Sequence, residues 1–394
     1  MIKLQVRHDV AAAVSYFLED AALSKEERTG VWVGSGCAHA RIPEGTLISA
    51  TDLTSMLSGR SPRGERLGEI LKPNRRAAWD CIVTPDKSIS LAALCLSKAI
   101  SERIKAAFKA ALAQLLHHME SLAYRQAPTP GNPPLPTNNL IAGQFLHQAS
   151  RHADPHLHAH LLIINATHCE DLRWRAIEPA PLYRSQTSLR IAFNNHLHRE
   201  LMARGFASSL SAKNIASLPV PKALCDIYSK AHNAIIGMAS RILDSGVVDA
   251  RWQGLSHSAL VDRLNDRSRP KQRPAKPDWE SLFNQDQKTH LEGLILARRP
   301  SPPKRPKTVP TPSTLIRRAW FSLMTDERNV RRCVEKAVSN APDVPVGTLA
   351  RAAMNFRSRP VVPPFVPTTR VKRNHLLSRR SALLMRKRSP RITR

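Results

Sequence analysis

The spacing of apolar residues predicts a strand followed at once by a helix at the start of the chain. Ile2–Val6 is a short apolar-rich segment typical of a strand, and His8–Ala22 repeats apolar residues at intervals of three and four. The only tyrosine in this region falls within the second segment. Tyr16 is therefore expected on a helix close behind an N-terminal strand.

Three further apolar runs predict strands. Trp79–Val83 has the composition of a buried strand, and Leu140–Ser150 and Leu157–Thr167 are separated by a turn that contains Asp154 and Pro155. We expect the last two segments to pair as a hairpin.

Two long helices are predicted, one between Trp79–Val83 and the hairpin and one after the hairpin. One runs from about Asp86 to Leu122, and the Thr84–Asp86 segment before it offers an N-cap residue, a proline for the first helical position and an acid for the first turn. The other is Tyr183–Arg204, closed by Gly205.

Charge divides the chain into two regions. The protein has 394 residues with 60 Lys and Arg against 31 Asp and Glu, a formal net charge of +29. From Arg298 onward there are 24 basic and 4 acidic residues, so this tail carries +20 and the preceding residues carry +9. Net charge indicates partners and not fold, so the sequence predicts a polyanionic partner.

Composition also excludes some classes of protein. No run of about 18 apolar residues is present, and the N-terminal sequence lacks the apolar stretch of a cleaved signal peptide, so we expect no membrane insertion. The six cysteines are scattered without a Cys-x-x-Cys pair, which is typical of reduced thiols. We therefore expect a cytoplasmic protein.

Three histidines in the predicted hairpin have the spacing of metal ligands. His158 and His160 are two residues apart, so in a strand both side chains point to the same face. His147 lies 11 residues before His158, and a turn between them would bring it opposite that pair. Three converging imidazoles with open positions for water or substrate would form a metal site.

The histidines also allow a structural interpretation, in which each ring is a hydrogen-bonded residue of the core. His152 and His156, in the turn, are expected to be solvated. His158 and His160 lie in an apolar run, where two polar rings need partners, and this favours a metal over a purely structural role. Imidazole suits zinc, copper, nickel and iron, whereas a phosphate-binding site in a cell also suits magnesium or manganese.

Several ordered motifs resemble those of one known family. In chain order they are similar to motifs of conjugative relaxases of the TrwC/TraI type, which are MobF-like members of the HUH endonucleases. The resemblance covers roughly residues 1–210, and the segments that carry it are Ala12–Asp20, Trp32–Gly36, Gly59–Gly64, Trp79–Ser90, His147–Asn165 and Leu182–Phe206.

The resemblance implies a fold and a chemistry. The fold is α+β, an HUH-type antiparallel β-sheet palm flanked by helices, with a basic and largely irregular C-terminal tail. The reaction is site- and strand-specific nicking, in which Tyr16 attacks the scissile phosphate to give a 5′-phosphotyrosine link and a free 3′-hydroxyl. Asp80 would orient a ligand histidine and assist removal of the phenol proton.

A divalent metal is the implied cofactor, with His147, His158 and His160 as its ligands. It would polarise the phosphate oxygens and orient the in-line attack. Magnesium or manganese is expected in the cell, with zinc, nickel and copper as alternatives.

The sequence departs from the family pattern in two ways. Many relatives carry one or two more tyrosines after the first, but here Phe17 and Ala21–Arg28 offer none, so a termination step that uses two tyrosines is not expected. Larger relatives also append an ATP-driven helicase, and no Gly-x-x-x-x-Gly-Lys-Ser/Thr loop occurs in this sequence.

The implied partner is DNA, as an origin hairpin with a single-stranded extension. Phosphate contacts would supply salt-dependent affinity, and the basic residues we single out are Arg60, Arg75, Arg76, Lys87 and Arg151. Further implied partners are accessory origin-binding proteins, a coupling protein and a type IV secretion system, with the bacterial cytoplasm as the location and export with DNA into a recipient cell.

These expectations divide the chain into a relaxase domain, residues 1–297, and a basic Pro-rich tail, residues 298–394, partly disordered. Within the same chemistry, a rolling-circle replication initiator is the alternative to a relaxase that starts mobilisation of plasmid or integrated-element DNA. A non-catalytic DNA-binding accessory protein is the alternative from a different class.

Overall fold

The computed structural model describes most of the first 357 residues. All described residues fall within Met1–Ser358, which forms one compact unit. They are residues 1–20, 23–68, 75–126, 134–150, 152–244, 260–261, 264, 278–296, 310–323 and 330–357.

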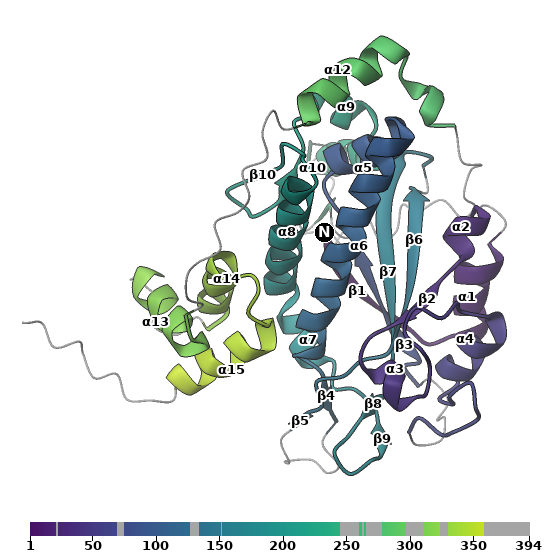
Figure 1. Ribbon diagram of the computed structural model, residues 1–394, viewed down its shortest axis with the longest axis vertical. Helices are drawn as coiled ribbons and strands as arrows, with labels where there is room; N and C mark the ends of the chain where they lie inside the picture. Colours follow the sequence, from purple (N-terminus) through teal and green to yellow (C-terminus); the bar gives the residue numbers. More distant parts are fainter. Residues whose placement is uncertain are drawn as a thin grey trace, which may run out of the picture. The chain divides into compact units, whose positions relative to one another are not determined.

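A five-stranded antiparallel sheet forms the centre of the unit (Figure 1), in the order β1-β3-β7-β6-β2. The predicted α+β class with an antiparallel sheet flanked by helices is therefore confirmed. The strands are β1 (Ile2–Arg7), β3 (Ala78–Val83), β7 (Pro155–Ile164), β6 (Ala142–Ala149) and β2 (Val31–Val33).

Three small two-stranded ribbons lie outside the main sheet. Their strands are β4 (Tyr124–Arg125) with β5 (Leu135–Pro136), β8 (Thr167–His168) with β9 (Trp174–Arg175), and β10 (Ser209–Leu210) with β11 (Ala216–Ser217).

Helices cover both faces of the sheet because its strands alternate buried side chains to each side. On one face the main core includes Leu161 and Ile163 of β7 and the apolar sides of α5 (Lys87–Cys95), α6 (Lys98–Glu120) and α8 (Gln186–Ala203). On the other face a second core includes Leu162 and Ile164 of β7 together with α1 (Val10–Val14), the π-helix η1 (Ser15–Glu19) and α4 (Ala50–Leu57).

The predicted helix from Asp86 to Leu122 is broken, and its cap lies two residues later than expected. Asp86 itself is the N-cap, because its side chain accepts the N–H of Ser88. Leu96 has extended backbone and ends α5, and the freed N–H of Ser97 donates to Glu292 at 2.9 Å. The predicted helix at Tyr183–Arg204 is likewise two helices, α7 (Ala180–Arg184) and α8.

The remaining helices of the described residues lie before β3 or after β11. They are α2 (Lys25–Arg28), α3 (Gly36–His39), α9 (Lys222–Ile227), α10 (Lys230–Asp244), the 3-10 helix η2 (Glu280–Leu282), α12 (Gln285–Ile295), α13 (Pro312–Leu323), α14 (Val330–Asn340) and α15 (Val346–Arg357). The last three lie in the region predicted to be a basic tail, and α14 and α15 pack against α8 and α6. Residues 359–394 lie outside the described residues, so the disorder expected for them stays a prediction.

Two buried histidines connect α15 to the main core. His118 Nδ1 accepts the N–H of Val346 at 3.2 Å, and the Nε2 atoms of His118 and His196 are 3.1 Å apart. Burial, with smaller contributions from neighbouring histidines, lowers the pKa of His118 to about 3. A neutral ring is required here, because a proton on Nδ1 would face the N–H of Val346.

Close backbone approach supports the same contact. Gly347 donates its N–H to Ser121 Oγ at 2.9 Å, and a Cβ at position 347 would overlap the carbonyl oxygen of Ser121. Glycine is thus required for α15 to reach α6 at this point.

Candidate active site

Strand alternation gathers the polar residues of the sheet on one face. On β7, His158 and His160 point to the same face as Leu162 and Ile164, which belong to the second core. Asp80 of β3 pairs opposite Leu162, so its side chain points to that face as well. They therefore face the side on which η1 lies.

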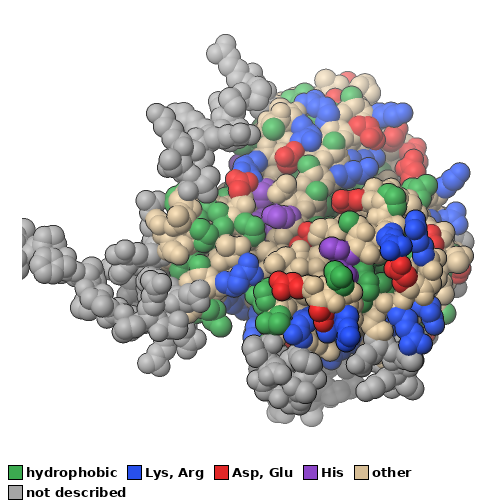
Figure 2. All heavy atoms as spheres, turned by 60° about the horizontal axis from the view of Figure 1, so that its bottom comes forward, with side chains coloured by type: hydrophobic (Ala, Val, Ile, Leu, Met, Phe, Trp, Pro, Cys, Tyr) green, Lys and Arg blue, Asp and Glu red, His purple; other side chains and the backbone are tan. Residues whose placement is uncertain are grey.

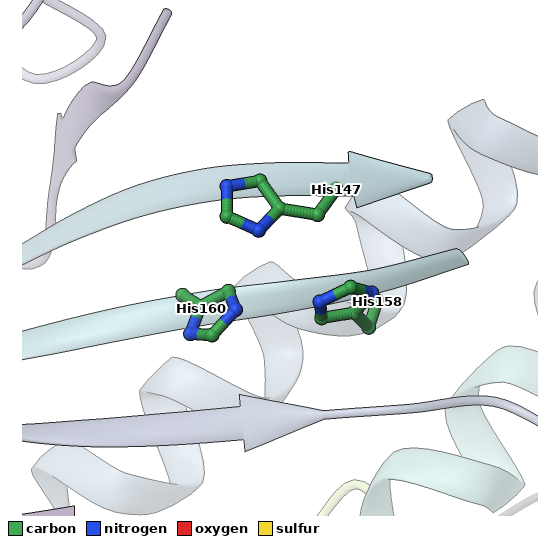
Figure 3. Close-up of side chains that lie close together, drawn as sticks. All are labelled: His147, His158 and His160. Atoms are coloured by element: carbon green, nitrogen blue, oxygen red, sulfur yellow. The ribbon is translucent and has the colours of Figure 1, made fainter. Parts of the chain in front are cut away.

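The three histidines lie close together on neighbouring strands (Figure 3). His147 pairs directly opposite His158 across the β6–β7 hairpin, and His160 follows two residues later on β7. Nitrogen atoms from the three rings all lie within 4.8 Å of one another, and all three residues are buried. The sequence prediction that a hairpin brings them together agrees with this geometry.

Hydrogen bonds fix which ring nitrogen can bind a metal. Nδ1 of His160 donates to Oδ1 of Asp80 at 2.8 Å, and Nδ1 of His158 donates to the carbonyl oxygen of His156 at 2.9 Å. Because a carboxylate and a carbonyl can only accept, both Nδ1 atoms carry a hydrogen, which leaves Nε2 as the nitrogen of each ring that can bind a metal. Burial, aided by nearby histidines, lowers the pKa of His158 well below its ordinary value, so this ring is neutral at pH 7.

These donors fit a divalent metal ion. Nε2 of His160 is buried and has no hydrogen-bond partner among the described residues. Rings whose Nδ1 hydrogen is held by an acceptor, as in His158 and His160, match the ligand set of metal sites that keep positions open for substrate. Among the described residues, this is the cluster whose side chains can hold a metal ion.

Asp80 lies beneath His160 and is fully buried. Its Oδ1 accepts from His160, and its Oδ2 forms an ion pair with Arg7 of β1. Burial opposes ionisation of the carboxyl, but the contacts with His160 and Arg7 outweigh it and hold the pKa of Asp80 below its ordinary value. Asp80 is therefore an ionised second-layer partner of a candidate metal ligand.

Tyr16 lies above this cluster. The predicted helix His8–Ala22 is present as α1 followed by η1, and Tyr16 is the second residue of η1. Its ring centroid is 5.7 Å from that of His160 and 6.2 Å from that of His147. Tyr16, Asp80 and the three histidines thus meet at one place, although their chemical roles stay predictions.

Arg7 was missed by the sequence reasoning. Its guanidinium carbon lies 5.1 Å from the centroid of the Tyr16 ring while the same group pairs with Asp80. Arg7 follows Gln5 by two residues, so the two side chains point to the same face of β1, and Gln5 pairs opposite Asp80. The sequence indicates the shared face but not the pairing of β1 with β3, so it identifies no partner for Arg7.

The predicted DNA-binding residues that the structure describes differ in their exposure and in their contacts. Arg60 and Arg76 are exposed. Arg75 is half-buried with its guanidinium against the carbonyl of Leu57, and burial lowers its pKa. Lys87 donates to the carbonyl of Pro155 at 2.9 Å, where β7 begins, and burial lowers its pKa too. Arg151 lies outside the described residues.

Figure 2 displays one face of the molecule by side-chain type. Lysine and arginine side chains are spread over the described surface and are interspersed with acidic ones. The positive charge of this face is therefore dispersed, and DNA contact by the named arginines and lysine stays a prediction. No helix in the described ranges is long and apolar enough to cross a membrane.

An antiparallel sheet with a three-histidine cluster, an aspartate behind it and a tyrosine-bearing helix above it defines the HUH endonuclease class. The family model described as TrwC relaxase matches residues 3–290. The chain belongs to the TrwC relaxase family.

Comparison with individual proteins agrees with this assignment. The chain is 26% identical over 181 residues to the multifunctional conjugation protein TraI of Escherichia coli, a match that spans 44% of this chain and 10% of that protein. It is also similar to a metal-bound structure of the conjugative relaxase TrwC in complex with oriT DNA, and to a copper-bound structure of the same complex. Each has a TM-score of 0.59 and 25% identity, and covers 75% of this chain and 98% of the other.

Proposed function

We propose that this protein nicks one strand of an origin DNA by transesterification and so starts mobilisation of plasmid or integrated-element DNA. The observation that carries the proposal is the meeting of Tyr16, Asp80 and three histidines on one face of the sheet. Membership of the TrwC relaxase family favours mobilisation over replication initiation.

In the proposed reaction, the phenol oxygen of Tyr16 attacks the scissile phosphorus. A bond forms from this oxygen to phosphorus, and the bond to the 3′ oxygen breaks, leaving a 5′-phosphotyrosine and a 3′ oxygen that takes up a proton to become a hydroxyl. Because one phosphodiester replaces another, the step is reversible without ATP. Tyr16 must lose its proton, since a neutral phenol is a weak nucleophile.

Asp80 would act first as an orienting group. Its two oxygens are both occupied, Oδ1 by His160 and Oδ2 by Arg7, so it keeps His160 with the lone pair on Nε2. Removal of the Tyr16 proton by Asp80 would require Oδ2 to exchange its contact with Arg7. Arg7, near both the phenol ring and Asp80, would then stabilise negative charge on the attacking oxygen.

A divalent cation would be held by His147, His158 and His160. When bound, it supplies positive charge that polarises the nonbridging phosphate oxygens. Magnesium or manganese remains the expected ion in the cell. TrwC is described in complex with oriT DNA, and by this likeness we propose an origin hairpin with its single strand as the substrate and a coupling protein and secretion system as later partners.

The test is formation of a covalent adduct. Full-length protein is mixed with single-stranded origin DNA from its own element and Mg²⁺ or Mn²⁺, and a shifted band is sought on a denaturing gel. We expect an adduct with the wild type and with Tyr183→Phe, and none with Tyr16→Phe or with EDTA. An adduct with Tyr16→Phe would reject the nucleophile, and no adduct with the wild type would reject the reaction.

A further inference from the structure

A buried glutamate lies beside the strand that carries His147. Glu27, in α2, is 1% exposed. Its Oε1 accepts the backbone N–H of Gln148 at 2.7 Å, and its Oε2 accepts the N–H of Ser24 at 3.1 Å. These two donors stabilise a carboxylate that burial would otherwise penalise.

Glu27 contacts β6 beyond the stretch of this strand that pairs with β2. Within the described residues, β2 pairs with β6 from Ala142 to Gln144, and no described strand lies along the outer edge of β6 at Gln148. On the inner edge, regular pairing with β7 runs to His147 and shifts before Ala149. His147 is thus the last residue of the regular ladder, and just beyond it, on the outer side, Glu27 accepts the N–H of Gln148.

We propose that Glu27 is a positioning residue for the metal ligand His147, an inference that rests on the proposed function. By holding the N–H of Gln148, Glu27 fixes the course of β6 next to the irregular pairing and therefore the place of the His147 ring. Metal–nitrogen bonds tolerate deviations of only about 0.2 Å, so a strand free to shift at this point weakens metal binding.

The same contact connects the nucleophile to the metal site. α2 follows η1 in the chain and contacts both η1 and β6. Glu27 therefore links the segment that carries Tyr16 to the strand that carries His147, and keeps the two at a fixed separation.

Metal affinity tests the proposal without DNA. Co²⁺ is titrated into the full-length apo protein and followed by its visible absorption, and Mn²⁺ binding is measured by calorimetry. In Glu27→Gln the amide oxygen can accept one N–H, but the amide NH2 faces the other donor. We expect this variant to bind both ions at least about tenfold more weakly and with an altered Co²⁺ spectrum, as for other groups that orient ligands.

Two matched variants separate positioning from helix capping. Glu26→Gln changes the exposed neighbour in the same helix. Ser24→Ala removes the hydroxyl that accepts the N–H of Glu27 at 3.2 Å, and so disrupts the cap without touching Gln148. Both should bind metal within twofold of the wild type.

The outcomes are distinct. If Glu27→Gln binds Co²⁺ as the wild type does, or if Ser24→Ala weakens binding equally, Glu27 is not a positioning residue. If the wild type binds neither ion, the proposed metal site fails together with the inference. If circular dichroism finds Glu27→Gln unfolded, Glu27→Asp, which keeps the charge but shortens the reach, replaces it and should lose affinity with the same spectral change.

Discussion

Replacing Asp80 by asparagine removes the charge that connects His160 to Arg7 while keeping the side-chain shape. His160 and Arg7 both act as donors, one to each carboxylate oxygen. An asparagine has one acceptor oxygen and one NH2 group, so in either orientation a donor faces a donor. If the NH2 group faces His160, the ring must move its hydrogen to Nε2, and this nitrogen can no longer bind a metal.

The magnitude follows from the burial of the three groups. Breaking a buried ion pair costs about 3–5 kcal/mol, and each charge-assisted hydrogen bond contributes about 1.5–3 kcal/mol. The Arg7 side chain is 28% exposed and can recover part of its hydration, whereas Asp80 is fully buried. We therefore expect Asp80→Asn to lower the free energy of unfolding by about 2–3 kcal/mol, and metal affinity by about 10–100-fold.

Urea unfolding followed by tryptophan fluorescence measures the first quantity, and Co²⁺ titration of the folded protein measures the second. Asp171→Asn is the matched control, because Asp171 forms an ion pair with Arg175 on the surface. That variant should match the wild type in metal affinity and nearly so in stability. A loss below about 1 kcal/mol with unchanged metal affinity would refute the role assigned to Asp80.

Three further predictions concern the metal site and the C-terminal helices. Mn²⁺ should raise the melting temperature of the wild type and not that of His158→Ala, since only a folded three-histidine site gains binding energy; an equal rise in both would argue against the site. The pKa of His118 is about 3 in the folded protein, below the 6.5 of an unfolded histidine, so the stability from its neutral ring is complete above pH 6.5 and is lost as the pH falls towards 3. His118→Gln should remove this dependence, about 1.4 kcal/mol per pH unit in urea unfolding at successive pH values. Gly347→Ala should destabilise by about 1–3 kcal/mol through overlap with the carbonyl of Ser121, whereas Gly293→Ala, with open space around it, should be neutral or slightly stabilising in the same assay.

Local patterns predicted much of the fold and of the candidate site. The histidine spacing led to the hairpin because strand alternation is a local property, and the structure places His147 opposite His158. Helix limits were less predictable. At the break at Leu96, the N–H of Ser97 is freed from the helix and donates to Glu292, 195 residues further along the chain. No local signal identifies such a distant partner.

The DNA-binding residues illustrate a second limit. The sequence shows basic residues close to the predicted strand that carries Asp80, but their burial in the folded protein decides which of them can contact DNA. Arg75 and Lys87 are partly buried and donate to backbone carbonyls, Arg60 is exposed and donates to the carbonyl of Gly64, and Arg76 is exposed. Sequence alone does not distinguish a basic residue that supports a loop from one that is available to a phosphate.

The sequence by itself determined the residue types of the site, their faces on each strand and the excess of positive charge. These depend on the period of a strand or helix and on composition, which are fixed along the chain. Only the tertiary structure decided that Arg7 reaches Asp80, that Glu27 supports the strand of His147, and that His118 contacts Val346. Each of these contacts joins segments 73 or more residues apart, and such pairs are chosen by how buried faces pack and how buried polar groups find partners.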